Sequence, residues 1–266
     1  MTGPTPSLSG SSRVGRTIIA TAGTWPKGTK LSYQWKANDV SIEGATKSSM
    51  AVTPALKDKR LTVTVTGKRA GYATVSHTSR TSKPVAPGTM VSATPGLSGS
   101  SRIGQKIYAK PGTWSKGTKL TYQWKANGKA ISGAAKSSMT VTPSLKGKRL
   151  SVTVTGRMAG YTTISHTSRV LKPVALGILS AWTPKISGPA RVGSKLTATA
   201  GSWSSGTKFS YQWYADGRAI KGATKTTLVL GSAQKGKRIT VKVTGSKSGY
   251  TTVSKRSHKT AVIRAR

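Results

Sequence analysis

The sequence predicts an all-β fold made of three consecutive β-sandwich modules. Three observations carry this prediction. The chain repeats itself with a fixed period, apolar residues occupy every second position within the recurring segments, and turn-forming residues separate those segments at short intervals. A fixed period sets the number of modules before local structure is considered. No segment shows a convincing helical period, so strands and turns are expected throughout.

Aromatic residues mark the period. They recur in register as Trp25, Trp114 and Trp203, as Tyr33, Tyr122 and Tyr211, as Trp35, Trp124 and Trp213, and as Tyr72, Tyr161 and Tyr250. We therefore expect repeat 1 at residues 1–88, repeat 2 at residues 89–177 and repeat 3 at residues 178–266. Modules of this size bury only about 60–65% of their unfolded surface, so each core is expected to be modest.

The strands of a module can be placed in chain order from the alternation of apolar and polar residues, which is the period of a strand with one face in a core. In repeat 1 they are expected at residues 8–15, 18–22, 31–36, 50–52, 61–66 and 74–79. Within the third of these, Tyr33 and Trp35 face inward and alternate with polar neighbours. The same alternation recurs at the corresponding positions of repeats 2 and 3.

Turn signals between the strands indicate antiparallel pairing. Asn127-Gly128 and Asp216-Gly217 lie between alternating segments, where such dipeptides favour tight hairpins. Seven or so short strands in about 89 residues predict an antiparallel sandwich, and the strand order fits an immunoglobulin-like layout in which Trp35 is the buried tryptophan of the third strand. The chain has no cysteine, so no disulfide assists the fold.

Charge is the second extreme feature. Forty-four Lys and Arg face four acids, which gives a formal net charge of +40. A charge of this size favours polyanionic partners. The candidates are wall teichoic acids or another anionic envelope polymer, acidic polysaccharide and nucleic acid.

Catalysis is not expected. The four acids do not recur in register, and His77 and His166 are replaced in repeat 3 by Lys255, so no acid–base pair is repeated. No nucleophile elbow, P-loop or metal-ligand cluster is present, so neither a metal nor another cofactor is expected. Tandem copies of one module suit reach, avidity or attachment better than a single site of unlike groups.

One end of each module combines an aromatic residue with several cations. In an immunoglobulin-like sandwich the loop between the second and third strands meets the turn between the last two strands. Such a tip could bind sugars or polyanions through stacking and charge. The candidate tip residues are Trp25, Lys27, Lys30, Lys68, Arg69 and Tyr72 in repeat 1; Trp114, Lys116, Lys119, Arg157 and Tyr161 in repeat 2; and Trp203, Lys208, Lys247 and Tyr250 in repeat 3.

Each aromatic tip residue also has a purely structural interpretation. Trp25 and its counterparts could close the end of the sandwich instead of offering an exposed platform. Gly71-Tyr72 could be a turn glycine followed by an anchoring tyrosine. Further basic clusters, such as Lys57–Arg60, are expected at the opposite end, so the charge is spread over the module. Diffuse charge indicates non-specific adhesion to a polyanion or a solubility role, and no recognition helix for base-specific DNA reading is visible.

A recurring string of motifs covers nearly the whole chain. It runs Ser-Gly-x-x-x-Val-Gly, Gly-Thr-Trp, Tyr-Gln-Trp-x-Ala-x-Gly, Ile-x-Gly-Ala-x-Lys, Lys-Arg-Leu/Ile-x-Val-x-Val-Thr-Gly and Gly-Tyr, and repeat 3 matches it best at residues 211–220. This string resembles the Ig-like repeats of secreted and cell-surface proteins of Gram-positive, mainly actinobacterial, bacteria. The resemblance implies export and a non-catalytic role, but it carries no ligand site. The near absence of acids departs from the pattern.

The linkers predict how the modules are joined. Lys83–Gly88 and Lys172–Gly177 are short and contain proline, so we expect semi-rigid spacing and an extended rod. No apolar run reaches the length of a membrane span. Met1 aligns with Met90 inside a linker, which suggests a start within a longer gene with an export signal or another domain upstream, whereas residues 261–266 look like a true C-terminus.

Three hypotheses for function remain open. The leading one is a secreted or cell-surface module that holds its owner on an anionic cell envelope or polysaccharide, with avidity from three linked copies. The second is a structural or decoration protein of a phage virion or surface assembly. The third is non-specific binding of extracellular nucleic acid.

Overall fold

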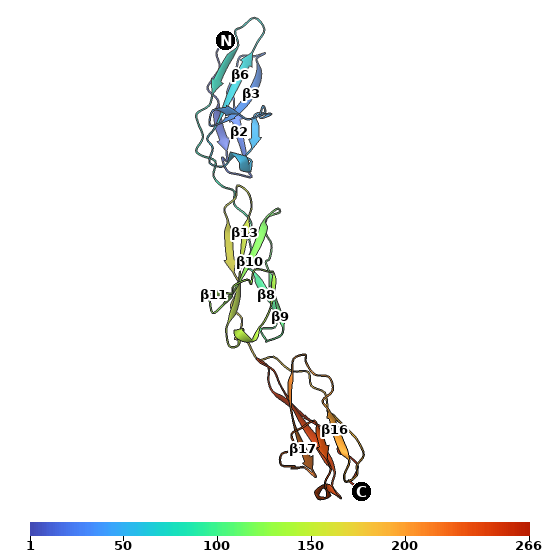
Figure 1. The fold of residues 1–266 in the computed structure, drawn as a ribbon. Helices are drawn as coiled ribbons and strands as arrows, with labels where there is room; N and C mark the ends of the chain where they lie inside the picture. The colour runs from blue at the N-terminus through green and yellow to red at the C-terminus, as the bar shows by residue number, and fades with distance from the viewer. The chain divides into compact units, whose positions relative to one another are not determined.

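The computed structural model describes all residues, Met1–Arg266, and contains six antiparallel sheets and no α-helix. The sheets form three pairs, one pair within each predicted repeat, and each pair has one three-stranded and one four-stranded sheet (Figure 1). This confirms the predicted all-β fold of three tandem Ig-like sandwich modules. By their internal contacts, the residues divide into two compact units. The first holds Met1–Gly96, Pro111–Tyr122 and Thr153–Ser168, and the second holds the remainder.

Repeat 1 shows the arrangement that the other repeats copy. Its three-stranded sheet has the order β1 (Ser7–Gly10), β2 (Thr17–Thr21), β5 (Ser49–Ala51). Its four-stranded sheet has the order β4 (Val40–Ser41), β3 (Lys30–Ala37), β6 (Leu61–Lys68), β7 (Val75–Thr78). A single 3-10 turn, η1 (Pro54–Leu56), precedes β6.

The other two repeats have the same order of elements. In repeat 2 these are β8 (Gly96–Gly99), β9 (Lys106–Lys110), β10 (Lys119–Ala126), β11 (Lys129–Ala130), β12 (Ser138–Thr140), η2 (Pro143–Leu145), β13 (Leu150–Arg157) and β14 (Ile164–Thr167). In repeat 3 they are β15 (Lys185–Ser187), β16 (Lys195–Thr199), β17 (Lys208–Ala215), β18 (Arg218–Ala219), β19 (Thr227–Val229), η3 (Ser232–Gln234), β20 (Ile239–Ser246) and β21 (Val253–Arg256).

The core of each module is centred on one tryptophan. Trp35, Trp124 and Trp213 are completely buried, as the alternation predicted. In repeat 1 the indole N–H of Trp35 donates to the carbonyl of Lys47 at 2.9 Å, so its one polar atom is satisfied inside the module. Apolar residues of β6 pack in the same cluster, and the threonines that alternate with them are partly exposed, except for Thr62, which is buried. Burial of this apolar face is the main force that holds the two sheets together.

The hairpins form where the sequence predicted them. β10 and β11 pair so that only Asn127 and Gly128 lie between them, and both have positive φ (49° and 80°). This is the geometry of a two-residue hairpin turn, which Asn and Gly adopt at little cost. The Asn127 side chain also accepts a hydrogen bond from the Arg149 backbone N–H at 2.8 Å. Asp216 does the same for Arg238, so this acid acts as a turn residue rather than as a charge partner.

The first strand is shorter than predicted. We expected one strand over residues 8–15, but β1 ends at Gly10, where φ is +80°. The chain then turns, and the Val14 N–H donates to the carbonyl of Ala86 in the following linker at 3.0 Å. The turn therefore places Val14 and Gly15 at the end of the module opposite the candidate tip, which we call the base.

Candidate functional site

The structure brings the two halves of the tip of repeat 1 together. β3 and β6 are neighbours, and their register places Lys30 directly opposite Lys68. The loop that carries Lys27 enters β3, and the turn that carries Arg69 leaves β6. Two exposed ammonium groups therefore start from paired backbone positions, an arrangement that is destabilising without a counter-ion. In repeat 3 the equivalent pair is Lys208 and Ser246, so only one of the two charges is present there.

Trp25 closes the end of repeat 1 and is half-buried. Its indole N–H donates to the carbonyl of Ala22 at 3.0 Å, within its own loop. A Cβ added to Gly67 of β6 would overlap the indole, so the ring packs directly on that strand. His77 of the edge strand β7 lies beside it, with ring centroids 6.1 Å apart. The purely structural interpretation of Trp25, in which the ring closes the end of the sandwich, accounts for all these contacts.

The same construction recurs at the other two tips. Trp114 and Trp203 are half-buried, and their N–H groups donate at 3.0 Å to the carbonyls of Pro111 and Ala200. Each has a ring neighbour: His166 lies 5.9 Å from Trp114, and Phe209 lies 5.4 Å from Trp203. No indole N–H is left to bind a ligand, so the tip tryptophans can offer only the exposed parts of their rings.

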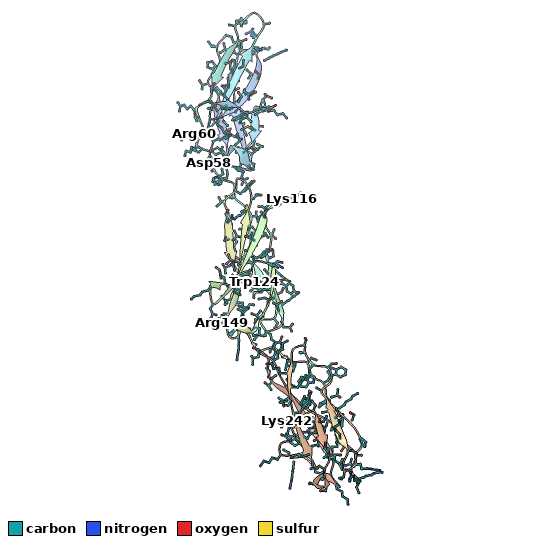
Figure 2. The ribbon with its side chains drawn as sticks, viewed as in Figure 1. Asp58, Arg60, Lys116, Trp124, Arg149 and Lys242 are labelled. Atoms are coloured by element: carbon teal, nitrogen blue, oxygen red, sulfur yellow. The ribbon has the colours of Figure 1, made fainter.

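The predicted tip cations are mostly free in solvent. Those that are exposed without an ion-pair partner are Lys27, Lys30, Lys68, Lys116, Lys119, Arg157 and Lys208 (Lys116 is labelled in Figure 2). Two others are ordered by their own turn. The Arg69 guanidinium lies 4.7 Å from the centroid of the Tyr72 ring, and the Lys247 ammonium lies at the same distance from Tyr250. Lys247 also donates to the carbonyl of Ser205 at 2.8 Å.

The three tip tyrosines have different surroundings. Tyr72 is 53% exposed. Tyr161, by contrast, is half-buried and packs against the hydrophobic core of repeat 1. Tyr250 is half-buried as well, and its ring lies on Gly177 at the end of repeat 2. Tyr161 and Tyr250 therefore face the preceding repeat rather than an open tip, whereas the expected contribution of Tyr72 to ligand binding stays a prediction.

A basic and aromatic cluster in repeat 3 was missed by the sequence reasoning. On the outer face of its four-stranded sheet, the Arg256 guanidinium lies 4.1 Å from the centroid of the Tyr214 ring, and Arg256 pairs across the strands with Lys242 (labelled in Figure 2). In repeat 1 the positions of Lys242 and Arg256 hold Thr64 and Thr78, whose hydroxyl groups are hydrogen-bonded at 2.9 Å. The sequence did contain a signal for this cluster, because repeat 3 has cations at two positions where repeat 1 has threonine.

The positive charge is hardly compensated within the molecule. The one ion pair joins Lys57 and Asp58 at 2.9 Å, and both side chains are largely exposed, so it adds little to stability. Arg60 and Asp58 lie at the base of repeat 1, opposite the tip (Figure 2). The cations thus remain available to external anions on both ends and on the sheet faces.

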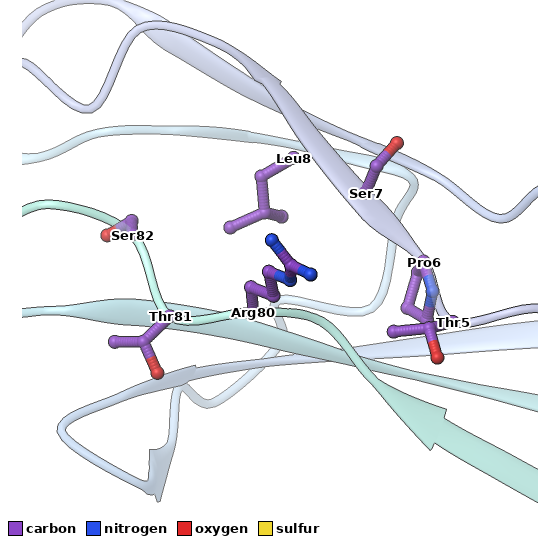
Figure 3. Close-up of a pocket in the computed structure, with 7 residues that line it drawn as sticks. All are labelled: Thr5, Pro6, Ser7, Leu8, Arg80, Thr81 and Ser82. Carbon is purple, nitrogen blue, oxygen red and sulfur yellow. The ribbon is translucent and has the colours of Figure 1, made fainter.

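A groove between β1 and the segment after β7 is lined by Thr5, Pro6, Ser7, Leu8, Arg80, Thr81 and Ser82 (Figure 3). Its one charged lining residue is Arg80, whose side chain points toward Leu8. No cluster of three or more His, Cys, Asp or Glu side chains could hold a metal ion. The structure has no helix with the length and apolarity that crossing a membrane requires.

Comparison with known proteins gives matches only among solved structures, because no protein-family profile and no curated protein matches the chain. A Ca²⁺-stabilised adhesin with which an Antarctic bacterium binds ice is 13% identical, with a TM-score of 0.35 over 100% of this chain and 75% of that one. The three N-terminal domains of the bacteriophage RB49 outer capsid protein Hoc are 16% identical, with a TM-score of 0.29 over 96% of this chain and 97% of that one. The FN1–FN3 domains of chicken CNTN1 are 12% identical, with a TM-score of 0.24 over 96% and 99%. At these values the functional argument rests on the residues of this chain.

Proposed function

We propose that the chain is a non-catalytic, strongly basic tandem Ig-like module of an exported bacterial protein that attaches it to an anionic cell-envelope polymer or acidic polysaccharide. The observation that carries this proposal is the uncompensated charge. The chain has forty-four cationic side chains and four acids, and only one ion pair, which is exposed, forms between them. Self-repulsion of this size destabilises the compact state, and a bound polyanion relieves it.

The register of the tip supports a polymeric anion as the partner. Lys30 and Lys68 start from paired positions on neighbouring strands, with Lys27 in the adjoining loop. A carboxylate or phosphate held between such ammonium groups removes their mutual repulsion and forms charge-assisted hydrogen bonds. Lysine is well suited to this contact because it acts as a flexible point charge that follows an irregular polymer.

Repetition turns weak contacts into retention. A single tip offers a few solvated cations, and each such contact is screened by salt. When one repeat is bound, the next repeat meets the same polymer at a high effective concentration. Binding should therefore fall steeply with salt. It should also fall when a cationic tip is neutralised, even though no one residue is essential.

A salt-series retention assay on purified Gram-positive cell walls tests the proposal. Walls with and without their anionic polymers are compared with immobilised duplex DNA, using the full chain. Retention that requires the wall polymers and exceeds DNA binding at physiological salt is expected. Equal capture by intact and stripped walls contradicts the proposal, and equal capture by walls and DNA with the same salt dependence means that the charge is generic.

A matched pair of variants tests whether the tip matters. Lys30→Ser with Lys68→Ser neutralises the paired lysines of the tip and uses at the second position the serine that repeat 3 has there. Lys59→Ser with Lys83→Ser removes the same charge from exposed positions away from the tip. The tip variant should lose more retention than its control. If both lose the same amount, the polymer contacts the whole surface and the tip has no special role.

A further inference from the structure

The turn between the last two strands of a repeat contacts the base of the repeat before it. At the first junction, the Gly88 N–H donates to the carbonyl of Gly160 at 3.0 Å, and the Thr162 N–H donates to the carbonyl of Gly88 at 3.0 Å. Both partners belong to the first compact unit. At the second junction, within the second unit, Gly177 makes the same two bonds with Gly249 and Thr251 at 2.9 and 3.0 Å.

The tyrosine of that turn fills a socket built mainly from glycines. A Cβ at Gly88 would overlap the Tyr161 ring, and a Cβ at Gly15 would overlap its hydroxyl group, so the side chain spans the base from one glycine to the other. A Cβ at Gly160 would lie 2.8 Å from the Cα of Pro54, which forms another wall. The socket of repeat 2 consists of the equivalent Gly104, Pro143 and Gly177, and it receives Tyr250 in the same way.

Repeat 1 carries the same turn without a partner. Its Gly71-Tyr72 has the sequence and the positive glycine φ (76°) of Gly160-Tyr161 (75°). Apart from its two chain neighbours, no residue comes within 4 Å of a Cβ built on Gly71, and Tyr72 is 53% exposed. The equivalent turns of repeats 2 and 3 are both docked. The exposed Tyr72 therefore indicates that the turn of repeat 1 is a docking element as well.

We propose that the Gly71-Tyr72 turn docks into the base of another Ig-like module joined in line ahead of repeat 1. The expected partner module has the same residues at its base as repeat 1 has. These are a glycine that follows an aliphatic residue, a proline that forms one wall of the socket and a second glycine under the tyrosine ring, as at Gly15, Pro54 and Gly88. At each observed junction the turn contributes one tyrosine, a glycine packed on the proline and two backbone hydrogen bonds, which is a smaller contact than a stable interface between separate proteins requires. Covalent linkage supplies the effective concentration that such a small contact needs.

A second copy of this chain does not fit the turn. In the base of repeat 3, Ser232 stands in place of the proline, and Arg266 stands where Gly88 and Gly177 carry the tyrosine ring. The closest atom to a Cβ on Gly193, the counterpart of Gly15, is the Arg266 Nε at 3.7 Å. The arginine side chain thus lies in the region that the tyrosine fills at the other two bases.

Chemical nitration of tyrosines in an extended chain tests this proposal. A second copy of residues 89–178 is joined directly ahead of Met1 of the full chain. This keeps the spacing between each socket and the following tyrosine, and it offers Tyr72 a copy of the repeat 2 socket. Nitration of Tyr72 should slow by at least about tenfold, which corresponds to about 1.4 kcal/mol of docking free energy. Tyr108 is 47% exposed on a different part of the chain and should react at an unchanged rate as an internal control. The Ala73 amide, equivalent to that of Thr162, should become protected from hydrogen exchange.

The matched control carries Gly177→Arg in the added module only, which reproduces the base of repeat 3. No positive φ is required at Gly177, so this change blocks the socket without straining the backbone. Tyr72 should then react as fast as in the original chain. Fast nitration of Tyr72 with the intact socket, or equal protection by both added modules, overturns the proposal. Neither readout involves a polyanion, so the result is independent of the proposed attachment function.

Discussion

Tyr161 belongs to repeat 2, yet its removal should destabilise repeat 1. Its ring packs on the core cluster that contains Val14 and Val85, and a Cβ on Gly88 would overlap it. Burying a large apolar side chain completely stabilises a protein by about 1.5–3 kcal/mol. Because Tyr161 is half-buried, Tyr161→Ala should cost repeat 1 about 0.8–1.5 kcal/mol by the same scale.

This loss is large enough to measure in a module of this size. A change of about 1 kcal/mol lowers the melting temperature of a 60–100-residue domain by roughly 4–8 °C. Native-state hydrogen exchange gives the sharper assay because it assigns the loss to a repeat. The most protected amides of β6 should exchange about four to ten times faster in Tyr161→Ala, since 1.4 kcal/mol is about tenfold.

The control is the same substitution one junction further along the chain. Tyr250→Ala removes a ring from the base of repeat 2 and should leave the exchange of β6 in repeat 1 unchanged. Tyr161→Phe, which keeps the ring, should retain most of the stability. The reasoning is refuted if Tyr161→Ala accelerates exchange only within repeat 2, or if Tyr250→Ala affects β6 equally.

Three further changes separate core, tip and surface roles. Trp213→Ala should cost repeat 3 about 3–5 kcal/mol and unfold it selectively, whereas Trp203→Ala at the half-buried tip should cost clearly less, as urea unfolding with proteolysis would show. Gly156→Ala places a methyl group against Trp114 and should cost about 1–3 kcal/mol through overpacking, measured by the melting temperature of the full chain. Arg256→Thr restores the residue that the other two repeats have at this position. Loss of one phosphate contact should lower the slope of log affinity against log salt on duplex DNA by about 1, and the melting temperature should stay unchanged.

The sequence alone determined the module and its internal order. Alternation fixes which face of each strand is buried, so complete burial of Trp35 could be predicted from its neighbours. Asn127-Gly128 fixes its hairpin because few other dipeptides adopt two positive φ values cheaply. These features are local or repeat at a fixed period, and three copies of the pattern reinforce the assignment. The sequence also predicted that the loop and the turn that carry the lysines lie at the same end of the module, because they are adjacent in any sandwich of this order.

Only the tertiary structure decided what meets the outer surfaces of a module. The β3–β6 register placed Lys30 opposite Lys68, and a shift of one residue would have separated them. The end of β1 at Gly10 brought Gly15 to the base, where it meets the hydroxyl of Tyr161. The Gly-Tyr dipeptide is the same in all three turns, yet Tyr161 and Tyr250 are docked and Tyr72 is exposed. That difference depends on which neighbouring surface each turn contacts, and the alternation within a single strand carries no information about a surface in the preceding module.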